Sequence, residues 1–273
     1  MMRIALSIVL LLAASLPAMA QVARVDPLVR GLALGDIVAI MHEEGVDYGR
    51  DLDADLFDGR GGDRWAAMVT TIYDSGWMER TLSQALAEQL AGIDIDEMVA
   101  FFTSDRGSRI IRLEVSARRA LLDESVEQAS RAGLDDMILN RDPRLDLIRR
   151  FSDANALVEN NVVGAMNANY AFFSGLAEGG DFAGALTDEE ILADVWGQEQ
   201  MIRDDTEEWL FSYLALAYRP LSDEDLEAYI AFSESAPGKT LNNALFEAFD
   251  VMFVAISLAL GRAAAQFLAG EEL

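Results

Sequence analysis

The stretch FSESAPGKT, residues 232–240, comes closest in this chain to a known chemical motif. Its Gly238-Lys239-Thr240 matches the end of a P-loop, in which backbone amides and a lysine hold phosphate groups. A P-loop also requires a glycine five residues earlier, where Ser233 stands, and a preceding strand, where this chain has helical spacing. We therefore expect a corner between two helices here, without phosphate binding.

The acidic stretch DLDADLFDGRGGD places carboxylates where a calcium loop has its first ligands. Asp51, Asp53 and Asp55 occupy the first, third and fifth positions of such a loop. The loop would also need a glycine and a glutamate where Leu56 and Gly62 stand. We favour a solvated acidic loop between helices, and a calcium site at the three aspartates is the alternative.

No residue in the sequence can be assigned a catalytic role. His42 is the only histidine and the one candidate base for a hydrolase triad, but the chain has no G-x-S-x-G nucleophile motif. Without cysteine, a zinc site would have this single nitrogen ligand and no sulfur. Two carboxylates across a cleft could hydrolyse a glycosidic bond, and the many acidic residues leave that alternative open. We assign no cofactor.

The composition and the first residues predict an exported protein. The chain has 21 Lys and Arg against 47 Asp and Glu, a net charge of −26, which argues against binding nucleic acid or anionic lipid. Arg3, an apolar run over 4–16 and a small-x-small step before Gln21 are typical of a signal peptide over residues 1–20. We expect a periplasmic or secreted protein, with no cysteine for a lipid anchor.

Helical spacing of apolar residues runs through most of the chain, and the alternating pattern of strands is nearly absent. We therefore predict an all-α fold, an irregular helical bundle. Glycines and Asp-Pro steps mark the breaks. The expected helices cover residues 27–48, 63–90, 94–104, 108–131, 143–176, 187–218, 222–234 and 239–269.

Two segments of the sequence resemble one another. DIDEMVAFFTSDRG, which begins at Asp94, aligns without gaps with DLEAYIAFSESAPG, which begins at Asp225. In both segments we expect a glycine to close an apolar helix in the left-handed conformation before the next helix begins. The repeat predicts two related helical halves, residues 21–139 and 140–273. The corner residues are Phe101, Ser104 and Gly107 in the first copy and Phe232, Ser235 and Gly238 in the second.

The second copy resembles the bacterial family called domain of unknown function 2059. The hallmark of that family is an acidic helix start, an apolar helix ending in a Phe-x-x-Ser-x-x-Gly corner, and then a long apolar helix. Here residues 221–238 followed by 239–268 carry the pattern, and residues 94–122 match it more loosely. The resemblance implies an exported helical protein of unassigned activity, and it supplies no catalytic residue.

The long C-terminal helix, which contains VMFVAISLAL, is apolar on nearly all sides. Asp250 and Arg262 leave about 11 residues between charges, against the ~20 that a bilayer requires, so we expect no membrane span. Burial in the core is the favoured interpretation. The alternative is a homodimer seam or a groove for an apolar ligand, with Phe249, Phe253 and Ile256 as the interaction face.

The corresponding helix of the first half has a polar face instead. Arg109, Arg112, Arg118 and Arg119 would line that face, and Glu114 can pair with Arg118 one turn further on. The second half is therefore expected to supply the central helix of the bundle.

These observations predict a non-enzymatic protein of the cell envelope that binds a partner protein or a small apolar molecule. The lack of a recognisable catalytic motif and the apolar C-terminal helix motivate this expectation. A carboxylate-based hydrolase of the envelope and a calcium-steadied structural module are the alternatives.

Overall fold

The computed structural model describes residues 21–179 and 187–270, and within these it contains helices and no strand. The predicted all-α helical bundle is therefore confirmed. The predicted signal peptide, residues 1–20, lies outside the described residues. Residues 21–31 are helical, and they are followed by α2 (Leu34–Phe57), α3 (Gly62–Ile72), α4 (Ser75–Gln89), α5 (Asp96–Thr103), α6 (Asp105–Ala120), α7 (Glu124–Leu139), α8 (Arg144–Ala154), α9 (Leu157–Ala177), α10 (Asp188–Gly197), α11 (Glu199–Tyr218), α12 (Asp223–Glu234) and α13 (Ala236–Leu268).

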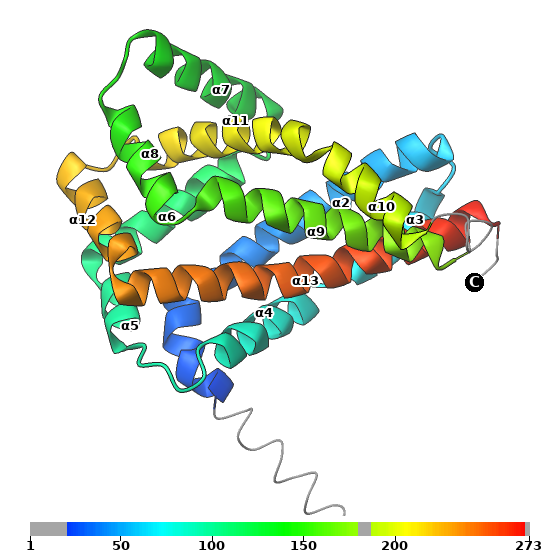
Figure 1. The fold of residues 1–273 in the computed structure, drawn as a ribbon, viewed down its shortest axis with the longest axis horizontal. Coiled ribbons are helices and arrows are strands. Elements are labelled where there is room, and N and C mark those ends of the chain that lie inside the picture. Colours follow the sequence, from blue (N-terminus) through cyan, green and yellow to red (C-terminus); the bar gives the residue numbers. More distant parts are fainter. Residues whose placement is uncertain (1–20, 180–186, 271–273) are drawn as a thin grey trace, which may run out of the picture.

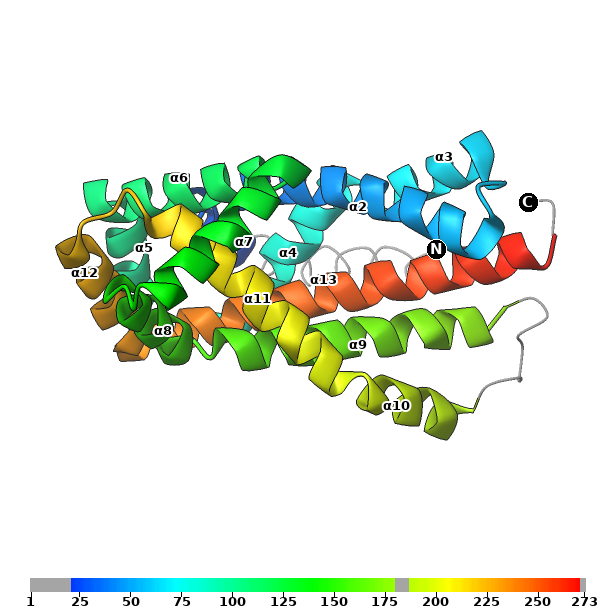
Figure 2. The same ribbon diagram turned by 90° about the horizontal axis from the view of Figure 1, so that it is seen from above.

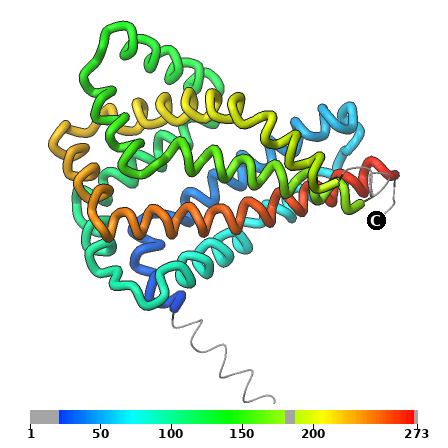
Figure 3. Tube along the Cα trace, in the orientation of Figure 1, coloured from blue at the N-terminus to red at the C-terminus, as the bar shows by residue number. Residues whose placement is uncertain are grey.

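The helix α13 is the spine of the bundle. It runs along most of the long axis, with α9 on one side and α4 on the other (Figure 1). Seen from above, α2, α3 and α6 form a second layer over α9 and α13, and α11 crosses obliquely (Figure 2). The short helices α5, α8 and α12 gather at one end of the molecule. The tube in Figure 3 shows that the last helix of the chain lies between segments from its first third and its middle.

Some expected helices are divided in the structure because polar caps interrupt them. The helices α3 and α4, expected as one, separate where the Asp74 carboxylate accepts a hydrogen bond from the Trp77 amide at 2.7 Å. The helices α6 and α7, also expected as one, separate at Asp123, whose carboxylate accepts from the Ser125 amide at 2.9 Å. Each cap satisfies an amide that has no partner within its own helix. The helical spacing of apolar residues continues across both breaks, so a prediction from spacing alone joins the neighbouring helices into one.

The two predicted corners have the same geometry. Ser104 ends α5 and begins α6 with φ −68° and ψ 162°, and Ser235 ends α12 and begins α13 with φ −70° and ψ 162°. Each serine hydroxyl accepts a hydrogen bond from the amide of the glycine three residues later, at 3.1 Å in both corners. A single serine therefore serves as the cap between two helices, and the chain turns without a loop.

The glycines at these corners serve close packing, which corrects the expectation of a left-handed helix end. Neither Gly107 nor Gly238 has a positive φ. A Cβ on Gly107 would lie 2.1 Å from the Phe101 carbonyl oxygen, and one on Gly238 would lie 2.0 Å from the Phe232 carbonyl oxygen. No side chain fits at such distances, so only glycine lets the new helix start directly against the end of the old one.

The order of helices and their turns also recurs along the chain. The helix over residues 21–31 leads into α2 through Ala33, at φ 50°, and α8 leads into α9 through Ala156, at φ 47°. The α6 helix packs against α11, and its counterpart α13 packs against α4. The two related halves stay a prediction, with which this correspondence is consistent, since the helix after each corner packs against a helix of the other predicted half.

The helices α9 and α13 meet backbone to backbone. A Cβ on Gly175 would lie 2.4 Å from the Leu258 carbonyl oxygen, and one on Gly261 would lie 2.0 Å from the Phe172 carbonyl oxygen. Within the described residues α13 is the one helix long and apolar enough to cross a membrane by length and composition, and 33% of its most apolar window is buried in the fold. Core helices of soluble proteins meet the same criteria, so the absence of a membrane span stays a prediction.

We expect Gly107→Ala and Gly238→Ala each to lower the free energy of unfolding by about 1–3 kcal/mol or more, because the added methyl group overlaps a carbonyl oxygen. The matched control is Gly133→Ala within α7, where a Cβ meets nothing within 4 Å. There alanine should stabilise by about 0.5–1 kcal/mol, since glycine weakens a helix interior. Urea unfolding followed by circular dichroism measures all three variants. Equal effects at the three sites would contradict the close-packing role.

Candidate functional site

The three aspartates of the calcium candidate do not form a site. Residues 51–57 continue α2, so Asp51, Asp53 and Asp55 lie along a helix and not in a loop. The Asp53 carboxylate accepts a hydrogen bond from the Gly61 amide at 2.6 Å, which fixes the turn after the helix. The described residues contain no group of three acidic, histidine or cysteine side chains that could hold a metal ion. The expected loop at these residues, whether solvated or calcium-binding, is therefore corrected to the last turns of a helix.

The other two chemical candidates, His42 and residues 238–240, lie on helices. His42 is half-buried on α2, and its Nδ1 lies 2.8 Å from the Tyr73 carbonyl oxygen, within hydrogen-bonding distance. The Gly238-Lys239-Thr240 stretch forms the first turn of α13 after a helix, where a P-loop would require a strand.

A cavity of about 240 Å³ lies beside the two corners. Residues from both predicted halves line it, on α2, α5, α6, α11, α12 and α13. Most of the lining is aliphatic or aromatic, and the rings belong to Phe102, Tyr213, Tyr229, Phe232 and Phe249. The polar side chains in the lining are Glu114, Asn155, Ser233 and Asn242. An apolar cavity with a few converging polar groups is the usual form of a small-molecule site.

The corners shape this cavity. The rings of Phe101 and Phe232 stack with centroids 4.2 Å apart and planes 14° apart, which joins the two corners across the molecule. Phe102 meets Phe232 edge-on at 5.4 Å and lines the cavity with it. Gly238 is also part of the lining. Two of the corner residues predicted from the sequence, Phe232 and Gly238, therefore line the cavity, and Phe101 packs against Phe232.

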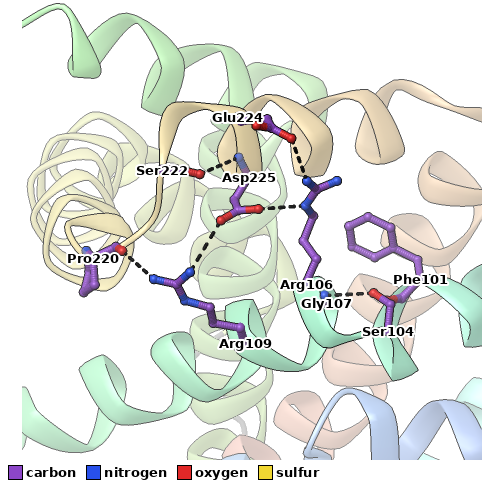
Figure 4. A network of polar contacts seen from close by, with 9 residues as sticks. All are labelled: Phe101, Ser104, Arg106, Gly107, Arg109, Pro220, Ser222, Glu224 and Asp225. Carbon is purple, nitrogen blue, oxygen red and sulfur yellow. Dashed lines mark hydrogen bonds and ion pairs between the residues drawn. The ribbon is translucent and has the colours of Figure 1, made fainter.

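Ion pairs hold the outer side of the same wall, as Figure 4 shows. The Arg106 guanidinium on α6 donates to Asp225 at 2.8 Å and to Glu224 at 3.2 Å on α12. Arg109 donates to the Pro220 carbonyl oxygen at 2.9 Å. The Arg106 guanidinium holds the pKa of the Asp225 carboxyl below its usual range. These contacts tie the start of α6 to the start of α12 and so fix the spacing of the two corners.

Glu114 is the one acidic residue in the lining. The Tyr218 hydroxyl donates a hydrogen bond to its carboxylate at 2.7 Å, and the Tyr213 hydroxyl donates to its backbone carbonyl at 3.3 Å. The side chain keeps some accessible surface because it faces the cavity, while protein surrounds it otherwise. The ion pairs of the described residues include none that involves Glu114.

Burial controls the protonation of this cluster. Loss of hydration raises the pKa of Glu114 from 4.5 to about 7, although hydrogen bonds from Tyr218 and Tyr229 favour the ionised form. Burial, and next the charge of Glu114, raises the pKa values of Tyr213, Tyr218 and Tyr229 well above their usual value of 10.0. The phenols therefore stay protonated, and the carboxyl can change its charge near neutral pH.

Helical spacing in the sequence predicts the wrong side-chain partner for Glu114. Helical spacing suggested a pair with Arg118, but the Arg118 guanidinium binds both carboxylate oxygens of Glu44 on α2, at 2.7 and 2.8 Å. It also lies 4.8 Å from the centroid of the Trp209 ring. Glu114 turns instead toward tyrosines about a hundred positions along the chain, a distance that local spacing cannot register.

The proposed interaction face on α13 is divided by the fold. Phe253 is 38% exposed, Phe249 is half-buried and lines the cavity, and Ile256 is buried in the core at 1% exposure. The three side chains therefore do not form one exposed face, and Ile256 is a core residue. Phe249 belongs to the lining of the cavity.

No family model matches this chain, and no curated protein or solved structure is significantly similar to it. The resemblance to the domain of unknown function 2059 family therefore stays a prediction.

The raised pKa of Glu114 predicts a pH-dependent stability. The unfolded chain ionises this carboxyl near 4.5, whereas the folded protein keeps the proton up to about 7. The free energy of unfolding should thus fall between these values as the pH rises, by on the order of 3 kcal/mol at 1.36 kcal/mol per pKa unit, and then level off. Glu114→Gln removes this contribution.

Urea unfolding of the wild type and Glu114→Gln at about pH 5 and about pH 8 measures the effect. The variant should gain stability relative to the wild type at the higher pH. A difference between the two proteins that is the same at both pH values would show that the carboxyl is not buried as described.

Proposed function

We propose that this protein is a non-enzymatic binding protein of the cell envelope that holds a small, mainly apolar molecule in the cavity beside Glu114. The observation that carries the proposal is the lining: aromatic and aliphatic side chains from both predicted halves surround one half-buried carboxyl. Such a lining can bind a small molecule selectively, because apolar contact supplies the affinity and one polar group sets the orientation of the molecule.

The size of the cavity limits the ligand. An apolar cavity of about 150 Å³ is known to accept benzene. This cavity, at about 240 Å³, has room for an aromatic ring with a short polar chain or for a branched aliphatic molecule of similar bulk. Lipids with long acyl chains and folded partner proteins would not fit inside it.

As part of this proposal, the binding role lies outside the cytoplasm. The predicted signal peptide over residues 1–20 and the net charge of −26 are typical of a soluble exported protein. The resemblance of the second corner to the domain of unknown function 2059 family agrees with this location. Carboxylate-based hydrolysis is not favoured in this cavity, because that chemistry requires two carboxylates and the lining contains one.

Filling the cavity should abolish binding. Leu245→Trp on α13 and Val115→Phe on α6 replace lining residues with larger ones. We expect each to weaken the binding of 2-phenylethanol by about tenfold or more, which corresponds to at least ~1.4 kcal/mol. Val251→Trp is the matched control, because Val251 is 50% exposed on α13 and lies outside the lining.

Isothermal titration calorimetry on the mature chain measures these affinities, and thermal melting verifies that each variant is folded. If both filled variants are folded and still bind the alcohol as the wild type does, the ligand occupies another place. If the wild type binds neither 2-phenylethanol nor its amine or carboxylate analogue, the binding function itself is wrong.

A further inference from the structure

The carboxyl of Glu114 takes part in no ion pair of the described residues. Its hydrogen-bonding neighbours are phenols, which donate protons but carry no charge. The basic residue one turn further along α6, Arg118, is occupied by Glu44 and by the face of Trp209. A buried carboxylate without a cation is costly, and the usual outcomes are protonation or binding of a cation.

The rings around this carboxyl provide the second component of a cation site. Phe102, Tyr213, Tyr229, Phe232 and Phe249 all line the same cavity. The face of an aromatic ring attracts a cation, and the attraction increases where water is excluded. Cages of aromatic side chains are the usual means by which proteins recognise organic ammonium groups.

The charge around the cavity also selects the sign of the ligand. No lysine, arginine or histidine is among the lining residues. The whole chain has a net charge of −26, so its field draws cations toward the protein and repels anions. An anionic ligand would meet a carboxylate and electron-rich rings without a basic side chain to receive it.

We infer that the cavity binds a small organic cation, an apolar protonated amine whose ammonium group pairs with Glu114 while its hydrocarbon part packs against the aromatic lining. This inference rests on the proposed function and specifies its ligand class. The carboxylate supplies a charge-assisted hydrogen bond, which is stronger than a bond between neutral groups. The rings hold the rest of the molecule and supply cation–π attraction.

A charge series on one molecular shape tests the inference. The probes are 2-phenylethylamine, 2-phenylethanol and 3-phenylpropanoate, a cation, a neutral molecule and an anion of similar size. Calorimetric titration of the mature chain at about pH 8 keeps Glu114 mainly ionised, above its pKa of about 7. The wild type should bind the amine about tenfold or more tightly than the alcohol, and the carboxylate least.

Two variants with the same chemical change locate the effect. Glu114→Gln removes the charge inside the cavity and should abolish the preference for the amine, while binding of the alcohol remains. Glu43→Gln removes a charge outside the lining, the one paired with Arg119 at the surface, and should leave the preference unchanged. If Glu114→Gln does not fold, the series on the wild type still decides the question.

The outcomes separate this inference from the function on which it rests. Equal binding of amine and alcohol by the wild type would overturn the cation site and leave an apolar binding protein. An amine preference that survives Glu114→Gln would also overturn it, since the selecting charge would lie elsewhere. Loss of that preference in Glu114→Gln alone would establish Glu114 as the partner of the ammonium group.

Discussion

The architecture depends on how closely one stretch of backbone approaches another at the two corners. At Gly107 and at Gly238 the space for a side chain is taken by a carbonyl oxygen of the preceding helix. That approach removes the need for a loop and directs each new helix back across the end of the old one. It also brings Phe101 and Phe232 into stacking contact, so the two corners form a single packed unit. The long helices diverge from this unit with the cavity between them.

The position of Glu114 follows from the same constraint. It lies on α6, the helix that begins at the first corner, and faces residues of α12 and α13, which meet at the second. Joining the corners therefore places the carboxyl opposite tyrosines from the other half of the chain. The ion pairs of Arg106 and Arg109 on the outer surface keep the two helix starts in register. The second corner therefore also forms part of the cavity, since Phe232 and Gly238 belong to both.

Local signals in the sequence predicted the helical class and the corners, but not the contents of the cavity. Phe101, Ser104 and Gly107 recur as Phe232, Ser235 and Gly238 at constant spacing, and a hydroxyl cap needs only neighbours in sequence. The surroundings of Glu114 could not be predicted, because its hydrogen-bond partner Tyr218 is 104 positions away in the sequence. The prediction of a loop at Asp51, Asp53 and Asp55 was wrong because a helix and a loop both tolerate closely spaced aspartates. The length of α2 decides between the two conformations. Ile256 was misplaced because an all-apolar helix does not show which side faces solvent.

The place of α13 in the chain has a consequence for the order of folding. It is the last helix of the described residues, yet it packs against α2, α3, α4, α5 and α9, all of which precede it. Met78, Leu82 and Leu86 are fully buried on α4, one of the helices against which α13 packs. Until α13 has been synthesised, the earlier helices lack the partner that covers part of their apolar surface. A chain that stops short of α13 would therefore leave that surface exposed, so the core is completed only by the final segment.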